Sequence, residues 1–178
     1  MSLRTIIFTF LLSLLMPVSI MASEIITLPD YSFKYSAITT ASKATIWRLW
    51  SDVEHWKDFD VRLEYSHLVG EKKFEVGAIG YLKGKHAPKT KFELIEVHEG
   101  VSFIESLKIP LYQTIELKRY FEKSEDGRVI FTHEVNFKGS LRALMYVLLS
   151  GPFKKDLKLV VERLKTVAES NELSHFKN

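Results

Sequence analysis

Short segments of strand length, separated by turn residues, fill the middle of the sequence and limit what this chain can fold into. About six such segments follow one another: Val61–Leu68, Ala78–Lys83, Lys89–His98, Val101–Lys108, Tyr112–Glu122 and Arg128–Phe137. The breaks between them fall at Gly70, Gly77, Gly84, Gly100, Pro110 and Gly127. This punctuation is typical of an antiparallel meander. We therefore expect one sheet in which each strand pairs with the next.

One more strand and a short helical region precede this meander. Tyr31–Thr39 alternates aromatic and polar residues with a period of two, which predicts a first strand. Ser42 is a good N-cap for a helix that carries an apolar stripe. The stripe consists of Ile46, Trp47, Leu49, Trp50 and Val53. We expect both tryptophans to pack in the core.

The period changes to that of a helix after the last strand. Apolar residues recur at spacings of three and four: Leu141, Leu144, Met145, Leu148, Leu157, Val160, Val161, Leu164 and Val167. Ser150, Gly151 and Pro152 must bend or interrupt this helix, because proline removes a backbone donor. A polar tail, residues 171–178, is expected after Ser170.

This order of elements resembles the START-like, Bet v 1-like (SRPBCC) superfamily, which includes polyketide cyclase/dehydrase and lipid-transport proteins. The resemblance spans about Tyr31–Glu169, and its most informative part is the helical stretch Ala44–Asp60. Local matches are Phe74, Val76 and Gly77, the pair Glu96 and Val97, the Asp126-Gly127 turn, and Phe137, Gly139 and Leu141. The resemblance implies an α+β helix-grip fold: a curved antiparallel sheet of about seven strands wrapped around a long C-terminal helix, with two short helices after the first strand. A cavity between sheet and helix is then expected.

The first 22 residues are typical of a secretory signal peptide. Arg4 precedes the apolar run Ile6–Leu15, Pro17 follows it, and the small residues Ala22 and Ser23 suit a cleavage site. The run is shorter than the roughly 20 apolar residues of a bilayer span, so an uncleaved anchor is the weaker alternative. We expect export to a periplasm or to the exterior. The mature chain is then one ligand-binding domain, residues 23–170, followed by the polar tail.

Composition excludes several classes of function. The 25 basic and 22 acidic residues alternate in sign along the chain, so the basic footprint of a nucleic-acid-binding protein is missing. The chain has no cysteine, which excludes disulfides, thiol nucleophiles and thiolate metal sites. A hydrophobic content of 46% is enough for one core, and this core alone must hold the fold.

A predicted hairpin provides the main candidate site. Gly127 suits the left-handed position of a three-residue loop, which sets the register of the flanking strands. The predicted pairs are Ser124 with Arg128, Phe121 with Phe131, Arg119 with His133, Leu117 with Val135, and Ile115 with Phe137. Arg119 and His133 are then the polar residues on an apolar face. Facing the cavity, they would offer a cationic site for a carboxylate or phosphate head. The alternatives are a bulge that sends Arg119 to solvent, or an acid such as Glu105 that neutralises it.

The predicted cavity lining combines this face with the helices. It comprises Trp47, Trp50, Phe103, Ile115, Leu117, Arg119, Phe131, His133, Val135, Met145, Leu149 and Phe153. The last three lie with Tyr146 near the bend of the C-terminal helix, where a soft surface could adapt to ligands or be simply core. An exposed apolar bend beside Lys154, Lys155 and Lys158 could instead make transient contact with a membrane.

Motifs for metal, nucleotide or hydrolytic chemistry are missing from the sequence. The histidines form no HExxH motif and no i, i+4 pair on a helix, so we predict no metal site. No serine lies in a G-x-S-x-G elbow, and the glycines between Val69 and Gly80 are too scattered for a dinucleotide loop. No cofactor is expected.

These observations favour a binding protein for a hydrophobic small molecule such as a lipid, fatty acid, polyketide or quinone. One alternative is a cyclase or dehydratase that uses the same cavity, with His133 as acid or base and Arg119 as the polarising group. The sequence offers that chemistry no clear partner carboxylate. Another alternative is a protein-interaction module like the coenzyme-Q-binding branch, for which we find no decisive motif.

Overall fold

The structure, a computed structural model, describes residues 24–70, 73–111, 113–124 and 127–175. Its elements are, in chain order, β1 (Ile26–Leu28), β2 (Ser32–Thr39), α2 (Lys43–Ser51), the 3-10 helix η1 (Val53–Asp58), β3 (Leu63–Leu68), β4 (Ile79–Gly84), β5 (Lys89–His98), β6 (Ser102–Ile109), β7 (Gln113–Glu122), β8 (Val129–Lys138) and α3 (Arg142–His175). The predicted signal peptide, residues 1–22, lies outside the described residues.

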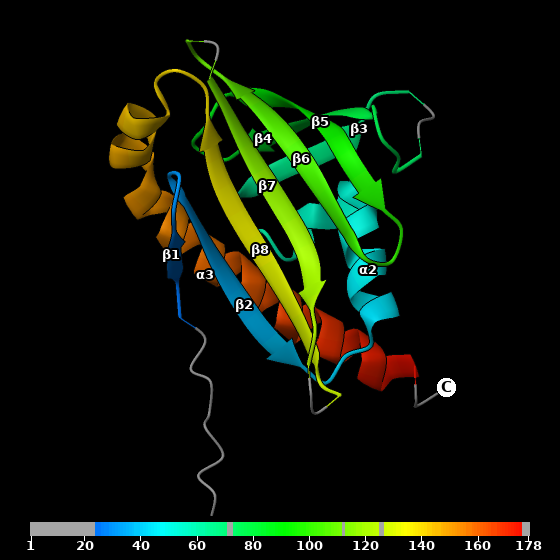
Figure 1. The fold of residues 1–178 in the computed structure, drawn as a ribbon. Helices are drawn as coiled ribbons and strands as arrows, with labels where there is room; N and C mark the ends of the chain where they lie inside the picture. The colour runs from blue at the N-terminus through cyan, green and yellow to red at the C-terminus, as the bar shows by residue number, and fades with distance from the viewer. Residues whose placement is uncertain (1–23, 71–72, 112, 125–126, 176–178) are drawn as a thin grey trace, which may run out of the picture.

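All eight strands belong to one antiparallel sheet, in the order β1-β2-β8-β7-β6-β5-β4-β3. From β3 to β8 each strand pairs with the next along the chain, which confirms the predicted meander. β2 pairs with β8 and so extends the sheet beyond the last strand of the meander (Figure 1). The strand beyond the seven expected is β1, which has three residues and pairs with the start of β2. It is too short to show a period in the sequence.

The long helix α3 covers the concave face of this sheet, as the helix-grip arrangement requires (Figure 1). Its contact surface consists of Leu157, Val160, Val161, Leu164 and Ala168, all buried. The helix runs through Pro152 without interruption, and its first turns point in a different direction from the rest (Figure 1). It therefore bends at this point rather than breaks. It also continues past Ser170 to His175, where the sequence predicted a polar tail.

Two short helices follow β2, as expected. Ser42 caps α2, with its hydroxyl oxygen 3.2 Å from the backbone nitrogen of Thr45. Trp50 is completely buried, and its carbonyl accepts a hydrogen bond from the Trp56 indole at 2.9 Å. Trp50 also lies at the centre of an aromatic cluster, with ring contacts to Phe103, Phe121, Phe131 and Trp47. This cluster fills one end of the space between the sheet and the helices.

Polar contacts attach the second half of α3 to β2 and to α2. The Tyr35 hydroxyl donates to Glu162 at 2.6 Å, and the Thr39 hydroxyl donates to Glu169 at 2.9 Å. Glu172 accepts hydrogen bonds from the hydroxyls of Ser42 and Thr45. These acids recur about every turn or two along one side of the helix, so its C-terminal half has a fixed position.

Replacement of Gly80 tests how tightly β4 packs. A Cβ at this position would lie 2.2 Å from the Phe92 ring and 2.7 Å from the His67 carbonyl oxygen. Phe92 is fully buried and stacks on Trp56, so it has little room to move. We expect Gly80→Ala to lower the free energy of unfolding in urea by about 1–3 kcal/mol.

Gly151→Ala is the matched control for this substitution. Gly151 lies inside α3, and apart from its chain neighbours and the backbone of the helix itself no atom lies within 4 Å of the place that a Cβ would occupy. Alanine favours a helix over glycine by about 1 kcal/mol, so the control should unfold at equal or higher urea concentration. Equal stability of the two variants would contradict the tight packing of Gly80 against Phe92.

Candidate functional site

The hairpin β7–β8 has the register that the sequence predicted. Arg119 pairs with His133, Phe121 with Phe131, Leu117 with Val135, and Ile115 with Phe137. The pairing continues without a shift from Thr114 to Glu122, so the alternative with a bulge is wrong. Gly127 has the expected left-handed conformation, with φ +75°. Glu125 and Asp126 of the predicted loop lie outside the described residues.

A cavity of about 650 Å³ lies between this face of the sheet and α3. Its volume falls within the range of roughly 300–1,000 Å³ that is common for small-molecule sites. Six residues of the predicted lining contribute to its wall: Ile115, Leu117, Arg119, His133, Val135 and Phe153. β7, β8 and α3 supply these six.

The other six predicted residues lie beside the cavity, in the core. Trp47, Trp50, Phe103 and Phe131 make ring contacts with one another and with their aromatic neighbours, and so fill space that the sequence analysis left open for a ligand. Met145 and Leu149 pack, partly buried, against the core. Compared with the prediction, the cavity therefore lies farther from α2 and closer to β4, β5 and the loop before β3.

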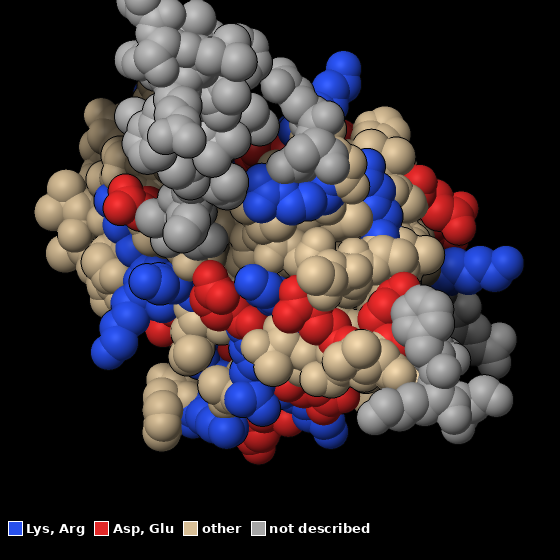
Figure 2. Space-filling model, turned by 90° about the horizontal axis from the view of Figure 1, so that it is seen from below, with Lys and Arg blue, Asp and Glu red and all other residues tan. Residues whose placement is uncertain are grey.

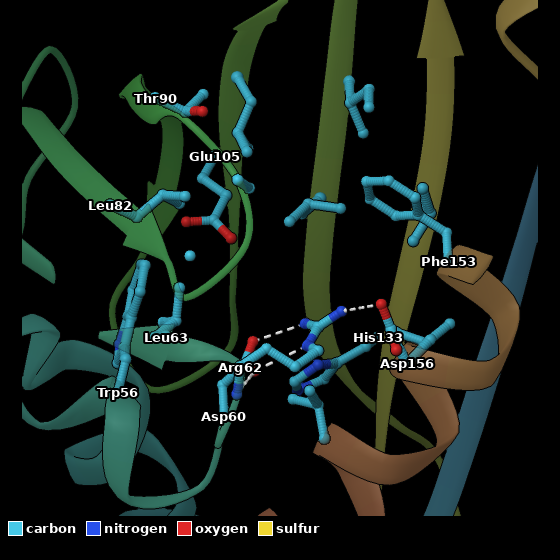
Figure 3. A pocket seen from close by; sticks show the side chains of 18 of the residues that line it. Trp56, Asp60, Arg62, Leu63, Leu82, Thr90, Glu105, His133, Phe153 and Asp156 are labelled. Atoms are coloured by element: carbon cyan, nitrogen blue, oxygen red, sulfur yellow. Dashed lines mark hydrogen bonds and ion pairs between the residues drawn. The ribbon is translucent and has the colours of Figure 1, made fainter. Parts of the chain in front are cut away.

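Several lining residues were missing from the sequence prediction. They come from η1, the loop after it, and the strands β3 to β6, and include Trp56, Asp60, Val61, Arg62, Leu63, Leu82, Thr90, Glu105 and Leu107 (Figure 3). The alternation along β6 contained a signal for one of them, since Glu105 lies between Phe103 and Leu107 on the inward face. A charge on an otherwise apolar face is the same signal that identified Arg119 on β7.

Glu105 neutralises Arg119. The Arg119 Nη2 donates to Glu105 Oε1 at 2.9 Å, and the two side chains are 9% and 1% exposed. The guanidinium also lies against two aromatic rings, 4.8 Å from the Trp56 centroid and 5.0 Å from that of Phe103. The predicted cationic site is therefore wrong in its charge, because the arginine is already paired. The alternative with Glu105 as its partner is the one that the structure adopts.

This buried pair leaves polar atoms without partners. Among the described residues, nothing accepts a hydrogen bond from Arg119 Nε or Nη1, and nothing donates to Glu105 Oε2. Burying such groups unpaired costs free energy, commonly about 1–3 kcal/mol each and more for charged groups. Both residues line the cavity. These three atoms have almost no accessible surface, so a ligand could satisfy them only after neighbouring side chains have moved.

The pKa of the Glu105 carboxyl is raised above its ordinary value. Its burial is the main cause, and the Arg119 charge acts in the opposite direction without cancelling it. Asp60, which lies on the same cavity wall, raises this pKa further. Proton uptake by Glu105 is therefore easier than for a carboxyl in water.

His133 is held as a neutral ring by a hydrogen bond from Trp50. The indole Nε1 can only donate, so His133 Nε2, at 3.1 Å, must be the acceptor and the ring proton lies on Nδ1. Burial, and then the charge of Arg119, lower the pKa of His133 well below its ordinary value. His133 is therefore no cation, and its basic nitrogen is occupied by the tryptophan.

Arg62 bridges two acids at the mouth of the cavity. It makes a bidentate contact with Asp60, at 2.8 Å from Nε and 2.6 Å from Nη2, and its Nη1 lies 2.7 Å from Asp156 of α3 (Figure 3). All three residues line the cavity, and Arg62 and Asp156 are more than a third exposed. The Arg62 bridge therefore connects the loop before β3 to α3 where the cavity meets solvent.

Within the described ranges, no group of three or more acidic or histidine side chains could hold a metal ion. The face seen in Figure 2 carries basic and acidic residues interleaved with one another, without a continuous basic band. That face therefore lacks the charge pattern with which proteins bind nucleic acid.

Titration of His133 predicts a change of stability with pH. Its pKa is lower in the folded than in the unfolded protein, so unfolding takes up a proton below about pH 6.5 and stability falls as the pH falls. The free energy of unfolding of the parent, relative to that of His133→Gln, should decrease by about 1.4 kcal/mol per pH unit in this range. Urea unfolding from about pH 7 to pH 5 measures it.

His55→Gln is the control for this titration. Its hydrogen bond with Asp52 raises the pKa of His55, so this contribution is present at low pH and is lost as the pH rises. The sign of its pH dependence is opposite to that of His133. A difference between parent and His133→Gln that stays constant with pH would contradict the neutral, buried ring.

Comparison with known proteins identifies the fold. No protein-family model matches the sequence, and no curated protein does. A START superfamily protein from Mycobacterium smegmatis matches at a TM-score of 0.58 and 12% identity, over 76% of this chain and 98% of that chain. Ara h 8.0201 matches at 0.52 and 10% identity, over 75% of this chain and 96% of that chain.

A third structure is the di-domain ARO/CYC StfQ from the steffimycin biosynthetic pathway. It matches at a TM-score of 0.60 and 12% identity, over 78% of this chain and 45% of that chain. At sequence identities this low, the matches support a common course of the backbone but give no information about the chemistry of the cavity. The chain has the helix-grip fold of the START-like and Bet v 1-like superfamily.

Proposed function

We propose that this protein binds and carries a hydrophobic small molecule inside the cavity. The observation that carries the proposal is a cavity of about 650 Å³ with apolar walls and a buried polar pair whose free atoms lack partners. An interior that served only to stabilise the fold would be packed with side chains and would contain no cavity of this size. Apolar walls with few polar groups are typical of sites for small ligands.

The polar pair suggests the chemistry of the ligand's head. Once neighbouring side chains give access to them, the two Arg119 nitrogens Nε and Nη1 offer donors, and Glu105 Oε2 offers an acceptor, or a donor when protonated. A neutral head with neighbouring carbonyl and hydroxyl oxygens would satisfy all three atoms. A fully ionised head would meet the Glu105 carboxylate as a like charge, which disfavours it. We therefore prefer a neutral oxygen-bearing head to the anionic head that the sequence alone suggested.

The apolar walls would take the body of the ligand. They come from both the sheet and α3, and include Leu82, Leu107, Ile109, Ile115, Leu117, Val135, Phe153, Leu157 and Val160. A lipid, a fatty acid, a polyketide or a quinone would meet this requirement. Burial of such a body contributes roughly 25 cal/mol for each Å² of apolar surface removed from water.

The proposal includes export of the protein. Residues 1–22 have the charged start, the apolar run and the small residues of a signal peptide. Cleavage after Ala22 would release the carrier into a periplasm or the exterior. A carrier in either place would take its ligand from, or deliver it to, a membrane or the surrounding fluid.

Native mass spectrometry of the protein recovered from the cells that express it tests this function. We expect one co-purified hydrophobic molecule per chain, and a protein mass equal to that of a chain that begins at Ser23. Leu117→Trp should reduce the bound fraction severalfold, because the larger ring occupies the cavity. Val76→Trp is the control, since Val76 is 60% exposed and lies outside the lining. An empty parent protein that also takes up no added lipid or quinone would refute the carrier.

Replacement of Glu105 tests the head-group chemistry. Fluorescence displacement with hexadecanoate and its methyl ester, at about pH 8 where the free acid is ionised, gives the ratio of the two dissociation constants. Glu105→Gln keeps an acceptor for Arg119 but removes the like charge. The ratio should shift towards the anion by about tenfold or more.

The double variant Glu105→Gln/Arg119→Met controls for folding, because it removes both charges of the pair together. Breaking one side of a buried ion pair can destabilise a protein, whereas replacing both sides is often tolerated. The double variant should bind both probes without a preference based on charge. An unchanged ratio in Glu105→Gln would contradict the role of Glu105 in selecting the head.

Glu105 also supports a second candidate function, acid–base catalysis on the bound molecule. It is the carboxylate that the sequence analysis did not find for a cyclase or dehydratase, and its raised pKa suits proton transfer. His133 is a poor partner, because Trp50 occupies its basic nitrogen. Chemical change of an added polyketide-like substrate by the parent, lost in Glu105→Gln, would favour this function over simple carriage.

A further inference from the structure

The first turns of α3 present apolar side chains to solvent. Leu141, Leu144, Val147 and Leu148 are 38%, 49%, 76% and 59% exposed. Their spacing of three and four residues places them on one side of the helix. We call these four residues, together with Leu111, the α3 apolar face. An exposed apolar patch of this kind indicates an interaction surface.

The apolar residues that the sequence placed near the bend lie on the other side of this helix. Tyr146 makes ring contacts with Tyr31, Phe33 and Phe137, and Phe153 contacts Phe137. Met145 and Leu149 also pack against the core. The inward side of the bend is therefore occupied, and the outward side carries the free apolar surface.

Gln113 brings Leu111 to the same place. Its side-chain nitrogen donates to the carbonyl of Leu111 at 2.7 Å, and its oxygen accepts from the backbone N–H of Leu141 at 2.8 Å. Gln113 is itself buried, so these two bonds fix the β6–β7 turn beside the start of α3. Leu111 is 64% exposed and adds to the patch.

The charges around this face have one sign. From Lys138 to Lys155 the chain carries four basic residues and no acid. On the helix, Lys155 and Lys158 follow Leu144, Val147 and Leu148 on the same side, by the helical period. The first acid of α3, Asp156, is already paired with Arg62. Lys138 is paired with Glu116, and Lys154 contacts Thr27 and the rings of Phe33 and Tyr146. The positive charge beside the apolar surface therefore comes mainly from Lys155 and Lys158.

We propose that the α3 apolar face docks on an anionic lipid membrane. A convex helix surface with exposed leucine and valine beside lysine matches the two requirements of peripheral membrane binding, apolar insertion and attraction to acidic headgroups. No helix of the described residues is long and apolar enough to cross the bilayer, so the contact is at the interface. A protein partner would have to supply both an apolar groove and acids.

Docking would place one wall of the cavity against the membrane. Phe153, which lines the cavity, belongs to the same helix, a few residues beyond Leu148. The proline at position 152 removes the donor for the carbonyl of Leu148. Membrane docking is a separate claim from ligand carriage, because either can exist without the other.

Co-sedimentation with vesicles tests the docking surface. The protein, in the form recovered from the cells that express it, is mixed with phosphatidylcholine vesicles with or without about one third phosphatidylglycerol. We expect binding to the anionic vesicles that weakens with added salt. Val147→Glu/Leu148→Glu should weaken it by at least about tenfold, because apolar insertion is lost and negative charge is added.

Leu173→Glu is the matched control, because Leu173 lies on the same helix and is 64% exposed, but near its other end. It should bind vesicles as the parent does.

The ligand content of the double variant, read by native mass spectrometry, should equal that of the parent, which separates docking from carriage. A parent protein that does not bind vesicles, or a double variant that binds equally well, would overturn the proposal. Loss of a dimer in the double variant, without any vesicle binding, would assign this face to self-association instead.

Discussion

The contact between the concave face of the sheet and the second half of α3 determines the rest of the structure. From Leu157 to Ala168 the inward side chains of the helix are buried, and acids on the same half bind β2 and α2. Before Leu157 the helix changes direction but keeps contact with β2 and β8 through the rings of Tyr146 and Phe153. The cavity lies beside Phe153, Leu157 and Val160, and the outer side of the first turns exposes Leu144, Val147 and Leu148. One packing arrangement therefore produces both features on which function depends.

A buried ion pair is costly in an apolar interior, and here it is only partly satisfied. Glu105 and Arg119 share one hydrogen bond, and the aromatic rings of Trp56 and Phe103 support the guanidinium. Apolar residues of the same shape would often be at least as stable. The pair therefore makes more sense as a means of recognising a ligand than as a means of holding the fold. The hydrogen bond from Trp50 to His133 keeps the neighbouring ring neutral, so it adds no second cation to this environment.

Periodicity and turn chemistry predicted the meander, the long helix and the register of β7 with β8, because these depend on local patterns. The alternation of side chains along β7 predicted which residues face the cavity. The length of the hairpin loop predicted that Arg119 pairs with His133. What fills the interior could not follow in the same way. Trp47, Trp50, Phe103 and Phe131 were equally compatible with a cavity wall and with a packed cluster, and only the three-dimensional arrangement decides between them. Arg62, Asp60 and Asp156 meet across about 95 residues of sequence, which no local pattern reveals.

In a carrier of the kind proposed, the Arg62 bridge would affect the rate of ligand exchange more than the strength of ligand binding. Its charges lie at the surface, where dissolved ions weaken their attraction, whereas Glu105 and Arg119 are buried and are screened much less. Release of Asp156 by the guanidinium would disturb neither Glu105 nor Arg119. A substitution in the bridge would then change the rates of ligand entry and exit together and leave the affinity largely unchanged, so exchange could be tuned during evolution while affinity is kept.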